Sequence, residues 1–221
     1  MVIHYASSEA GALKVAEECL ALGAKEVVTM KADMSDMESI QSLFADITKN
    51  HGKLDILVNN AGITADGLVM RMKPQQWQSV IDTNLSGVFY SSQAFFKQAC
   101  KNKIPGRIIN IASVVGQFGN PGQANYSAAK GGVLALTMSN AKEFAARGVT
   151  VNAICPGFIN SDMTKDLSAD YLDKMKGVIP LGRLGNPEEV AGMTRFLALD
   201  GAADYITGHH FNVDGGLAIG C

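Results

Sequence analysis

Short apolar runs alternate along the chain with longer stretches in which apolar residues recur every three or four positions. The short runs are rich in branched residues and predict strands at residues 2–5, 26–30, 54–58, 107–111, 150–154 and 210–213. The longer stretches predict helices at residues 9–22, 36–50, 75–101, 126–147 and 187–199. Because strands and helices alternate, the sequence predicts an α/β fold with a doubly wound parallel sheet covered by helices on both faces.

Capping residues mark several of the predicted helix ends. Ser35 stands where it can cap the helix that follows it, and Asn186 precedes a proline at the first position of the last helix. Gly148 follows the end of another helix, where glycine is common. These signals support the helix boundaries that the apolar pattern predicts.

The composition narrows the possible classes of function. The chain has 221 residues, 47% of them hydrophobic, without a linker-like stretch or repeat, and we expect one domain over residues 1–221. A net charge of -2 argues against nucleic acid or an anionic membrane surface as a partner. No apolar run approaches the ~18 residues that span a bilayer. The cysteines lack C-x-x-C spacing and the histidines lack helical ligand spacing, so we expect a reducing compartment and no catalytic metal.

Tyr126 and Lys130 form the pattern with the clearest chemistry. Residues four positions apart lie on one face of a helix, so the phenol and the ammonium can share a pocket. A nearby cation favours the phenolate, and we expect Lys130 to lower the pKa of Tyr126 toward a value useful near neutral pH. Ser113, at the end of a predicted strand, can point to the same carbonyl oxygen. The set is suited to protonating a ketone, although an isolated Tyr-x-x-x-Lys is usually an ordinary packing pair.

Loops that suit ligand binding follow three of the predicted strands. Residues 59–62 read Asn-Asn-Ala-Gly, Ser113 follows the strand at residues 107–111, and Pro156 and Gly157 follow the next strand. In a doubly wound sheet, ligands bind outside the carboxyl ends of the strands. The sequence therefore predicts a binding site where these loops meet.

The order and spacing of these segments resemble those of the classical short-chain dehydrogenases/reductases over essentially the whole chain. Within that superfamily the chain is similar to the beta-ketoacyl-[acyl carrier protein] reductases, at residues 59–64, 68–73, 123–126 and 156–159. The resemblance implies a Rossmann-like domain that reduces 3-oxoacyl thioesters on acyl carrier protein in fatty acid biosynthesis. Alternatives are an acetoacetyl-CoA or other ketone reductase of the same superfamily, and a noncatalytic truncated homologue.

The resemblance also implies catalytic roles. Tyr126 donates the proton, Ser113 hydrogen-bonds the carbonyl oxygen, and Lys130 lowers the tyrosine pKa and holds the nicotinamide ribose. Asn84 is implied to support a water relay that reprotonates Tyr126. Outside this context, Ser113 would be read as a strand-end cap and Asn84 as a helix amide bonded to the backbone.

NADPH is the cofactor that the resemblance implies. Asp33, next to Met34, is expected to contact the adenine amino group, the alternative being a structural acid at the start of the following helix. The loop at residues 5–8 offers hydroxyl groups instead of an acid, and Glu9 is expected to face outward, which favours NADP(H) over NAD(H). Further cofactor contacts are implied for Asn60, Ala61, Gly62, Tyr126, Lys130, Pro156, Gly157 and Ile159.

One part of the family pattern is not found in this sequence. Related proteins open with a strand and a turn of the form Thr-Gly-x-x-x-Gly-x-Gly, which holds the cofactor pyrophosphate. Residues 2–8 resemble the second strand of the family instead, so we expect about thirty-five residues, one strand-turn-helix unit, to be missing. We expect a fragment or a truncated gene model, because losing a central strand leaves two neighbours with unpaired backbone groups. The 221-residue chain is accordingly expected to bind NADPH poorly.

Substrate and partners leave weaker signals. Residues 160–180 are expected to form a mobile lid over the cofactor and the substrate. A cluster of cations could dock an acidic carrier protein, or could equally be solvated charges near helix ends: Arg147, Lys101, Lys103 and Arg107.

Assembly and location rest on resemblance alone. The related enzymes are homotetramers that use the helices at residues 75–101 and 126–147 and the C-terminal strand. The stretches at residues 155–159 and 179–183 resemble plastid-type members, so a plastid stroma is expected, with a bacterial-type cytoplasm as the alternative.

Overall fold

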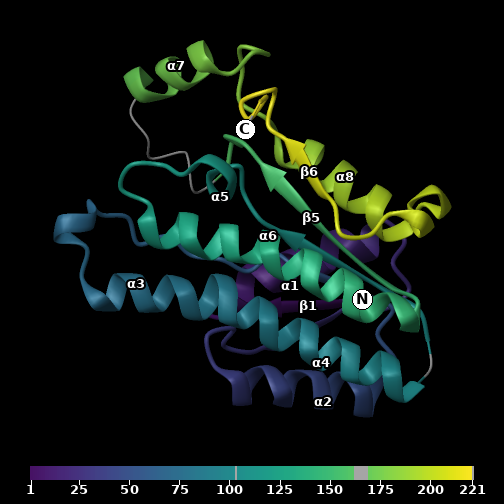
Figure 1. Cartoon of the computed structure of the whole chain (residues 1–221). Coiled ribbons are helices and arrows are strands. Elements are labelled where there is room, and N and C mark those ends of the chain that lie inside the picture. The colour runs from purple at the N-terminus through teal and green to yellow at the C-terminus, as the bar shows by residue number, and fades with distance from the viewer. Residues whose placement is uncertain (103, 162–168, 221) are drawn as a thin grey trace.

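Strands and helices alternate in the computed structural model, which describes residues 1–102, 104–161 and 169–220 (Figure 1). The strands are β1 (Val2–Tyr5), β2 (Val28–Lys31), β3 (Ile56–Asn59), β4 (Gly106–Ile111), β5 (Val149–Pro156) and β6 (His210–Val213). The α-helices are α1 (Glu9–Ala21), α2 (Met37–His51), α3 (Pro74–Ile81), α4 (Gly87–Asn102), α5 (Val115–Phe118), α6 (Ala124–Phe144), α7 (Ala169–Val178) and α8 (Pro187–Leu199). Single turns of other helix types are η1 (Val69–Arg71), η2 (Asp82–Ser86), η3 (Ala145–Arg147) and η4 (Gly201–Tyr205). The predicted α/β fold with parallel strands is confirmed.

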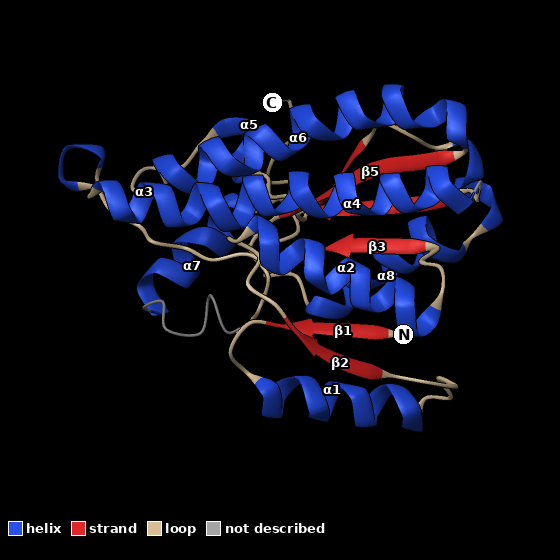
Figure 2. Cartoon of the chain, turned by 90° about the horizontal axis from the view of Figure 1, so that it is seen from below, coloured by secondary structure: helices blue, strands red, loops and turns tan. Residues whose placement is uncertain are grey.

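The described strands form two groups instead of one continuous sheet. β1 pairs with β2, and β3, β4, β5 and β6 form a four-stranded sheet in that order, with every pair parallel. β1 and β3 lie next to one another in Figure 2 and point the same way, but they are not hydrogen-bonded. Each therefore has one edge without a hydrogen-bonded partner strand among the described residues. Val58 on β3 is 41% exposed.

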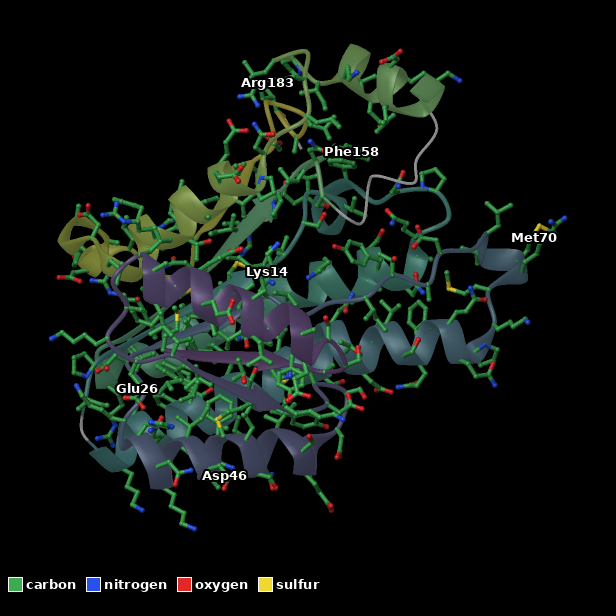
Figure 3. All side chains as sticks on the ribbon, turned by 180° about the vertical axis from the view of Figure 1, so that it is seen from behind. Lys14, Glu26, Asp46, Met70, Phe158 and Arg183 are labelled. Atoms are coloured by element: carbon green, nitrogen blue, oxygen red, sulfur yellow. The ribbon has the colours of Figure 1, made fainter. Side chains whose placement is uncertain are left out.

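Helices cover both faces of the strands. α2, α4 and α6 pack side by side on the face seen in Figure 1, whereas α1 and α8 lie on the opposite face, seen in Figure 3. The core under the first face joins Ile40 of α2, Phe95 of α4, and Ile108 and Val151 of the sheet. None of the helices that the structure describes is long and apolar enough to cross a membrane. Burial of the strands from both sides explains their nearly continuous apolar sequences.

Several predicted boundaries need correction. Asp36, not Ser35, caps α2: its carboxylate accepts hydrogen bonds from the backbone N of Glu38 and Ser39, each at 3.2 Å. Ser35 is turned away because its backbone N and its hydroxyl both donate to Asp33 Oδ1. The helix predicted at residues 75–101 is divided into α3, the π-helical turn η2 and α4. Part of the predicted lid at residues 160–180 is helical, as α7, and part lies outside the described residues.

Gly87 opens α4 at a point where the backbone of another segment presses against it. A Cβ atom at Gly87 would lie 2.2 Å from the carbonyl oxygen of Met34, which belongs to the loop between β2 and α2. No L side chain fits there unless this loop moves away from α4.

We therefore expect Gly87→Ala to destabilise the protein by about 2–3 kcal/mol, which lowers the melting temperature by roughly 5–10 °C. Gly192, in α8, is the matched control, because a Cβ atom there meets nothing within 4 Å. Gly192→Ala should raise stability by about 0.5–1 kcal/mol. Thermal unfolding of both variants checks this expectation, and equal melting temperatures would show that the loop yields without cost.

Candidate active site

The carboxyl ends of β3, β4 and β5 meet at a cavity of about 1140 Å³. The cavity continues along one side of α8. It collects most of the residues that the sequence singled out: Asn60, Ala61, Gly62, Ser113, Tyr126, Lys130, Pro156, Gly157 and Ile159. Loops from three strands thus meet at one edge of the sheet, as expected of a doubly wound fold.

Ser113 and Tyr126 are in direct contact in this cavity. The Ser113 hydroxyl is hydrogen-bonded to the Tyr126 phenol, and Ser113 Oγ also accepts a hydrogen bond from Val115 N at 3.2 Å. Ser113 is only 8% exposed, so its hydroxyl has little freedom. The two hydroxyl groups form a fixed pair of donors that a carbonyl oxygen could meet together.

Lys130 is held beneath this pair. Its ammonium donates to Ile111 O at 2.7 Å and lies 5.6 Å from the centroid of the Tyr126 ring. The side chain is 3% exposed, and burial lowers the pKa of Lys130 to about 8. An ammonium has three donors, so groups besides Ile111 O can still be bound by Lys130.

The pKa of Tyr126 differs from the expectation. Burial raises it above the ordinary value for a phenol, the hydrogen bond from Ser113 lowers it, and the charge of Asp66 raises it further. Lys130, whose ammonium lies 5.6 Å from the centroid of the ring, is not among the groups that shift this pKa. The expected lowering by Lys130 is therefore absent from this arrangement, in which Tyr126 is a neutral proton donor at neutral pH.

Asn84 lies in the π-helical turn η2 and is fully buried. Its amide exchanges two hydrogen bonds with the backbone of Ile63: Ile63 N donates to Oδ1 and Nδ2 donates to Ile63 O, each at 2.8 Å. A Cβ atom on Gly62 would lie 3.4 Å from Asn84 Oδ1 and 3.7 Å from Lys130 Nζ. Asn84 thus positions the loop after β3 and reaches the neighbourhood of Lys130, although it does not line the described part of the cavity.

Asp33 and Met34 follow β2 and are not among the described residues that line the cavity. The hydroxyl and the backbone N of Ser35 both donate to Asp33 Oδ1, which lowers the pKa of Asp33. Met34 packs against the core beneath α4. These contacts are those of the structural alternative for Asp33, and its contact with an adenine stays a prediction.

The loop at residues 5–8 lies beside a second cavity, of about 350 Å³. Partial desolvation raises the pKa of the Tyr5 phenol, and Glu9, which is hydrogen-bonded to it, raises this pKa further. Glu9 is exposed at the start of α1, in keeping with the expectation that it faces outward, and its carboxylate also reaches the Tyr5 phenol at the edge of the loop. A negative charge this close to the loop disfavours a 2′-phosphate there.

The predicted basic cluster is only partly present. Arg107 forms an ion pair with Asp204 and donates to Leu197 O and Asp200 O, so it fastens the end of α8 instead of facing a partner. Lys101 and Arg147 are exposed at the ends of α4 and η3, and Lys103 lies outside the described residues.

Sequence reasoning missed Asp66 and Gln123. Both line the cavity, and Gln123 Nε2 donates to Asp66 Oδ2 at 3.0 Å. Asp66 follows the Asn-Asn-Ala-Gly segment by only a few residues, so a search of the whole loop after β3 would have found it. The described residues contain no group of three or more metal-binding side chains.

The carboxyl edge of this parallel α/β sheet brings together a serine from a strand-end loop and, on one helix, a tyrosine followed four residues later by a lysine. This arrangement defines the class of the short-chain dehydrogenases/reductases. The family described as enoyl-(acyl carrier protein) reductase matches residues 1–218.

Similarity to three relatives identifies the group within this family. It is 51% identical to a 3-oxoacyl-[acyl-carrier-protein] reductase of Synechocystis over 219 residues, 99% of this chain and 87% of the relative. It is 47% identical over 217 residues to the 3-oxoacyl-[acyl-carrier-protein] reductase FabG of Staphylococcus aureus, and the match covers 98% of this chain and 87% of the relative. The Staphylococcus epidermidis enzyme is 46% identical over 217 residues, with 98% and 88% covered. The chain therefore belongs to the short-chain dehydrogenase/reductase family, in the 3-oxoacyl-[acyl-carrier-protein] reductase group, as the resemblance implied.

Burial of Lys130 generates a prediction about stability and pH. The pKa of Lys130 is lowered from 10.5 to about 8, so a buried charge destabilises the folded protein below pH 8. Between about pH 8 and 10.5 the folded state loses this proton before the unfolded state does, and stability should rise with pH across that window.

We expect Lys130→Met to be more stable than the wild type at pH 7, by about 1–3 kcal/mol, with the difference shrinking by about pH 10. Lys142→Met, an exposed change on the same helix, is the control and should show no such pH dependence. Denaturant unfolding at both pH values measures the effect. A Lys130→Met variant that is less stable than the wild type at pH 7 would show that the hydrogen bond to Ile111 O outweighs the cost of burial.

Proposed function

We propose that this chain is an oxidoreductase that uses NADPH to reduce 3-oxoacyl-[acyl carrier protein] to 3-hydroxyacyl-[acyl carrier protein] in fatty acid biosynthesis. The observation that carries the proposal is the contact of Ser113 with Tyr126, above buried Lys130, in a cavity at the carboxyl edge of the sheet. The relatives named 3-oxoacyl-[acyl-carrier-protein] reductase support the substrate. Residues 1–221 form one Rossmann-like reductase domain in this proposal.

The chemistry follows from the needs of a ketone that is being reduced. When it is bound, the cofactor supplies a hydride to the carbonyl carbon, and negative charge develops on the carbonyl oxygen. Ser113 donates a hydrogen bond to that oxygen, and Tyr126 donates the proton that completes the alcohol. Lys130 orients the tyrosine and holds the nicotinamide ribose, and Asn84 supports the return of a proton through water to Tyr126.

The cavity fits a dinucleotide in two respects. Its volume, about 1140 Å³, is above the usual range for a small-ligand pocket. Gly62 and Gly157 line the cavity with backbone instead of side chains. Asn60, Ala61, Pro156 and Ile159 would line the cofactor on this edge, and Asp33 and Met34 would lie toward its adenine end.

NADPH is favoured over NADH by the hydroxyl groups of Ser7 and Ser8 beside the second cavity. Glu9, whose carboxylate reaches the Tyr5 phenol, opposes the preference by placing a negative charge near the 2′-phosphate. The main support for NADPH is therefore the family. The Glu9 carboxylate reduces the preference for NADPH over NADH.

Docking of a carrier protein involves more than one subunit in our proposal. Helix α6 runs for about 30 Å, with Tyr126 at its start and Arg147 just beyond its end, so the two are far apart within one chain. A homotetramer in which α4 and α6 meet their own copies in antiparallel fashion would bring the partner subunit's Arg147 toward Tyr126. Exposed Phe89 and Met138 on these helices, 42% and 44% accessible, support such an interface.

Location is proposed on sequence likeness. The stretches at residues 155–159 and 179–183 resemble plastid-type enzymes, and we propose the plastid stroma, with a bacterial-type cytoplasm as the alternative.

Loss of the proton donor is the first test of the proposed chemistry. In a form of the protein that binds NADPH, Tyr126→Phe keeps the ring but removes the acid. Turnover of acetoacetyl-[acyl carrier protein] should therefore fall by at least ~100-fold while NADPH binding stays nearly unchanged. Tyr205→Phe is the control, since that ring is fully exposed. Rates come from NADPH oxidation and binding from fluorescence titration, and a near-normal rate for the Tyr126 variant would remove Tyr126 from the mechanism.

Charge reversal at Arg147 tests the carrier protein as substrate. Arg147→Glu should raise the Michaelis constant for acetoacetyl-[acyl carrier protein] by roughly tenfold, or about 1.4 kcal/mol, with a smaller effect at high salt. Ethyl acetoacetate, which needs no docking surface, should be reduced at the normal rate. Lys14→Glu, on α1 at the opposite face in Figure 3, is the control.

Two other outcomes have distinct meanings. Equal losses on both substrates would assign Arg147 to the fold or the assembly. Normal activity on both substrates would leave the carrier protein without a docking site at Arg147 and favour a general ketone reductase.

A further inference from the structure

One wall of the cavity is a fixed contact between two loops. Gly67 N donates to Gly122 O at 2.8 Å, and Asn125 Nδ2 donates to Ala65 O at 2.9 Å. These bonds join the loop after β3 to the start of α6, the helix that carries Tyr126. A side chain on this wall therefore has a defined position relative to Tyr126.

Asp66 places a carboxylate on this wall. Its Oδ2 accepts the hydrogen bond from Gln123 Nε2 at 3.0 Å, and its backbone O accepts one from Gln76 Nε2 at 3.1 Å. Gln123 is neutral, and the part of the chain that the structure describes holds no ion pair to Asp66. The carboxylate is thus oriented by its neighbours without being neutralised.

The charge of Asp66 reaches the reacting groups. Among the described residues that line the cavity, Asp66 is the single acid, and the cations are Lys130 and Arg195. Lys130 is buried and bonded to Ile111 O, whereas Asp66 is exposed to the cavity. The negative charge of Asp66 also raises the pKa of the Tyr126 phenol, so its field extends to Tyr126. A substrate whose ketone meets Tyr126 must therefore enter this field.

We propose that Asp66 is a specificity-determining residue that excludes substrates with a negative charge beside the reacting ketone and so restricts the site to neutral thioesters and esters. The inference rests on the proposed ketone reduction. Hydrolysis of a 3-oxoacyl thioester leaves a free 3-oxo acid with the same ketone and a carboxylate in place of the thioester. Without a repelling charge, the size and shape of the ketone alone would not separate the two compounds, since both fit a site that accepts the thioester.

The size of the effect follows from Coulomb's law. Two like charges about 6 Å apart, at an effective dielectric constant of about 40, repel enough to change kcat/KM roughly tenfold. Salt weakens the repulsion because the cavity is open to solvent.

Asp66→Asn isolates the charge, since the asparagine side-chain oxygen can still accept the hydrogen bond from Gln123. The probes are acetoacetate and ethyl acetoacetate, which share one ketone and differ in charge. We expect the ratio of kcat/KM for acetoacetate to that for ethyl acetoacetate to rise roughly tenfold in Asp66→Asn. Asp66→Glu, which keeps the charge, should retain the low ratio. Asp46→Asn removes an exposed acid from α2, far from Phe158 of the cavity in Figure 3, and should change neither rate.

The outcomes separate this inference from the proposed function. An unchanged ratio in Asp66→Asn, or equal losses on both ketones, would overturn it and leave Asp66 as a loop contact. A wild-type protein that reduces neither ketone nor carrier thioester would contradict the proposed function instead.

If the wild-type protein reduces none of these substrates, a measurement that needs no turnover still decides whether the Asp66 charge acts at Tyr126. The charged groups that face Tyr126 are Asp66 and Lys130, so removing the former should move the Tyr126 ionisation to lower pH. Ultraviolet titration of tyrosinate, with Tyr126→Phe subtracted, reads this ionisation. No shift in Asp66→Asn would overturn the inference.

Discussion

Helix α6 lies where it does because buried polar groups bond it to the sheet. Lys130 Nζ donates to Ile111 O at the end of β4, and Asn110 Nδ2 donates to Thr137 Oγ1 at 2.9 Å farther along the helix. Asn59 of β3 donates to Asn110 Oδ1 at 2.8 Å and so extends the network to a second strand. Such bonds are strong in a dry interior and costly to leave unmade. They fix the height and rotation of α6, and thereby the place of Tyr126.

Burying the Lys130 ammonium to anchor α6 lowers the stability of the folded protein. An ammonium that is 3% exposed loses most of its hydration, and this loss lowers the pKa of Lys130 to about 8. A leucine or methionine would destabilise the fold less at this position. In the proposed reaction this charge would lie beside the cofactor and the developing oxyanion, a role that would account for keeping a destabilising buried lysine here.

The sequence was informative where local patterns decide the structure. Apolar runs located β1 and β6 at their observed bounds, and most of the predicted site residues line the cavity. Contacts between distant segments were not visible in those patterns. Arg107, for example, meets Asp204 across 97 positions. The π-helical turn carries the Asn84 amide, which bonds the backbone of Ile63, another long-range contact that periodicity does not reveal.

The central claim is that a hydride reaches the ketone carbon of a 3-oxoacyl thioester in this cavity. Incubation of acetoacetyl-[acyl carrier protein] with NADPH deuterated at the transferred position of the nicotinamide tests it directly. We expect 3-hydroxybutyryl-[acyl carrier protein] with deuterium at the carbon that bears the hydroxyl, seen by mass spectrometry of the released acyl group. Recovery of unchanged thioester, or of product without deuterium at that carbon, from protein that binds NADPH would contradict the account.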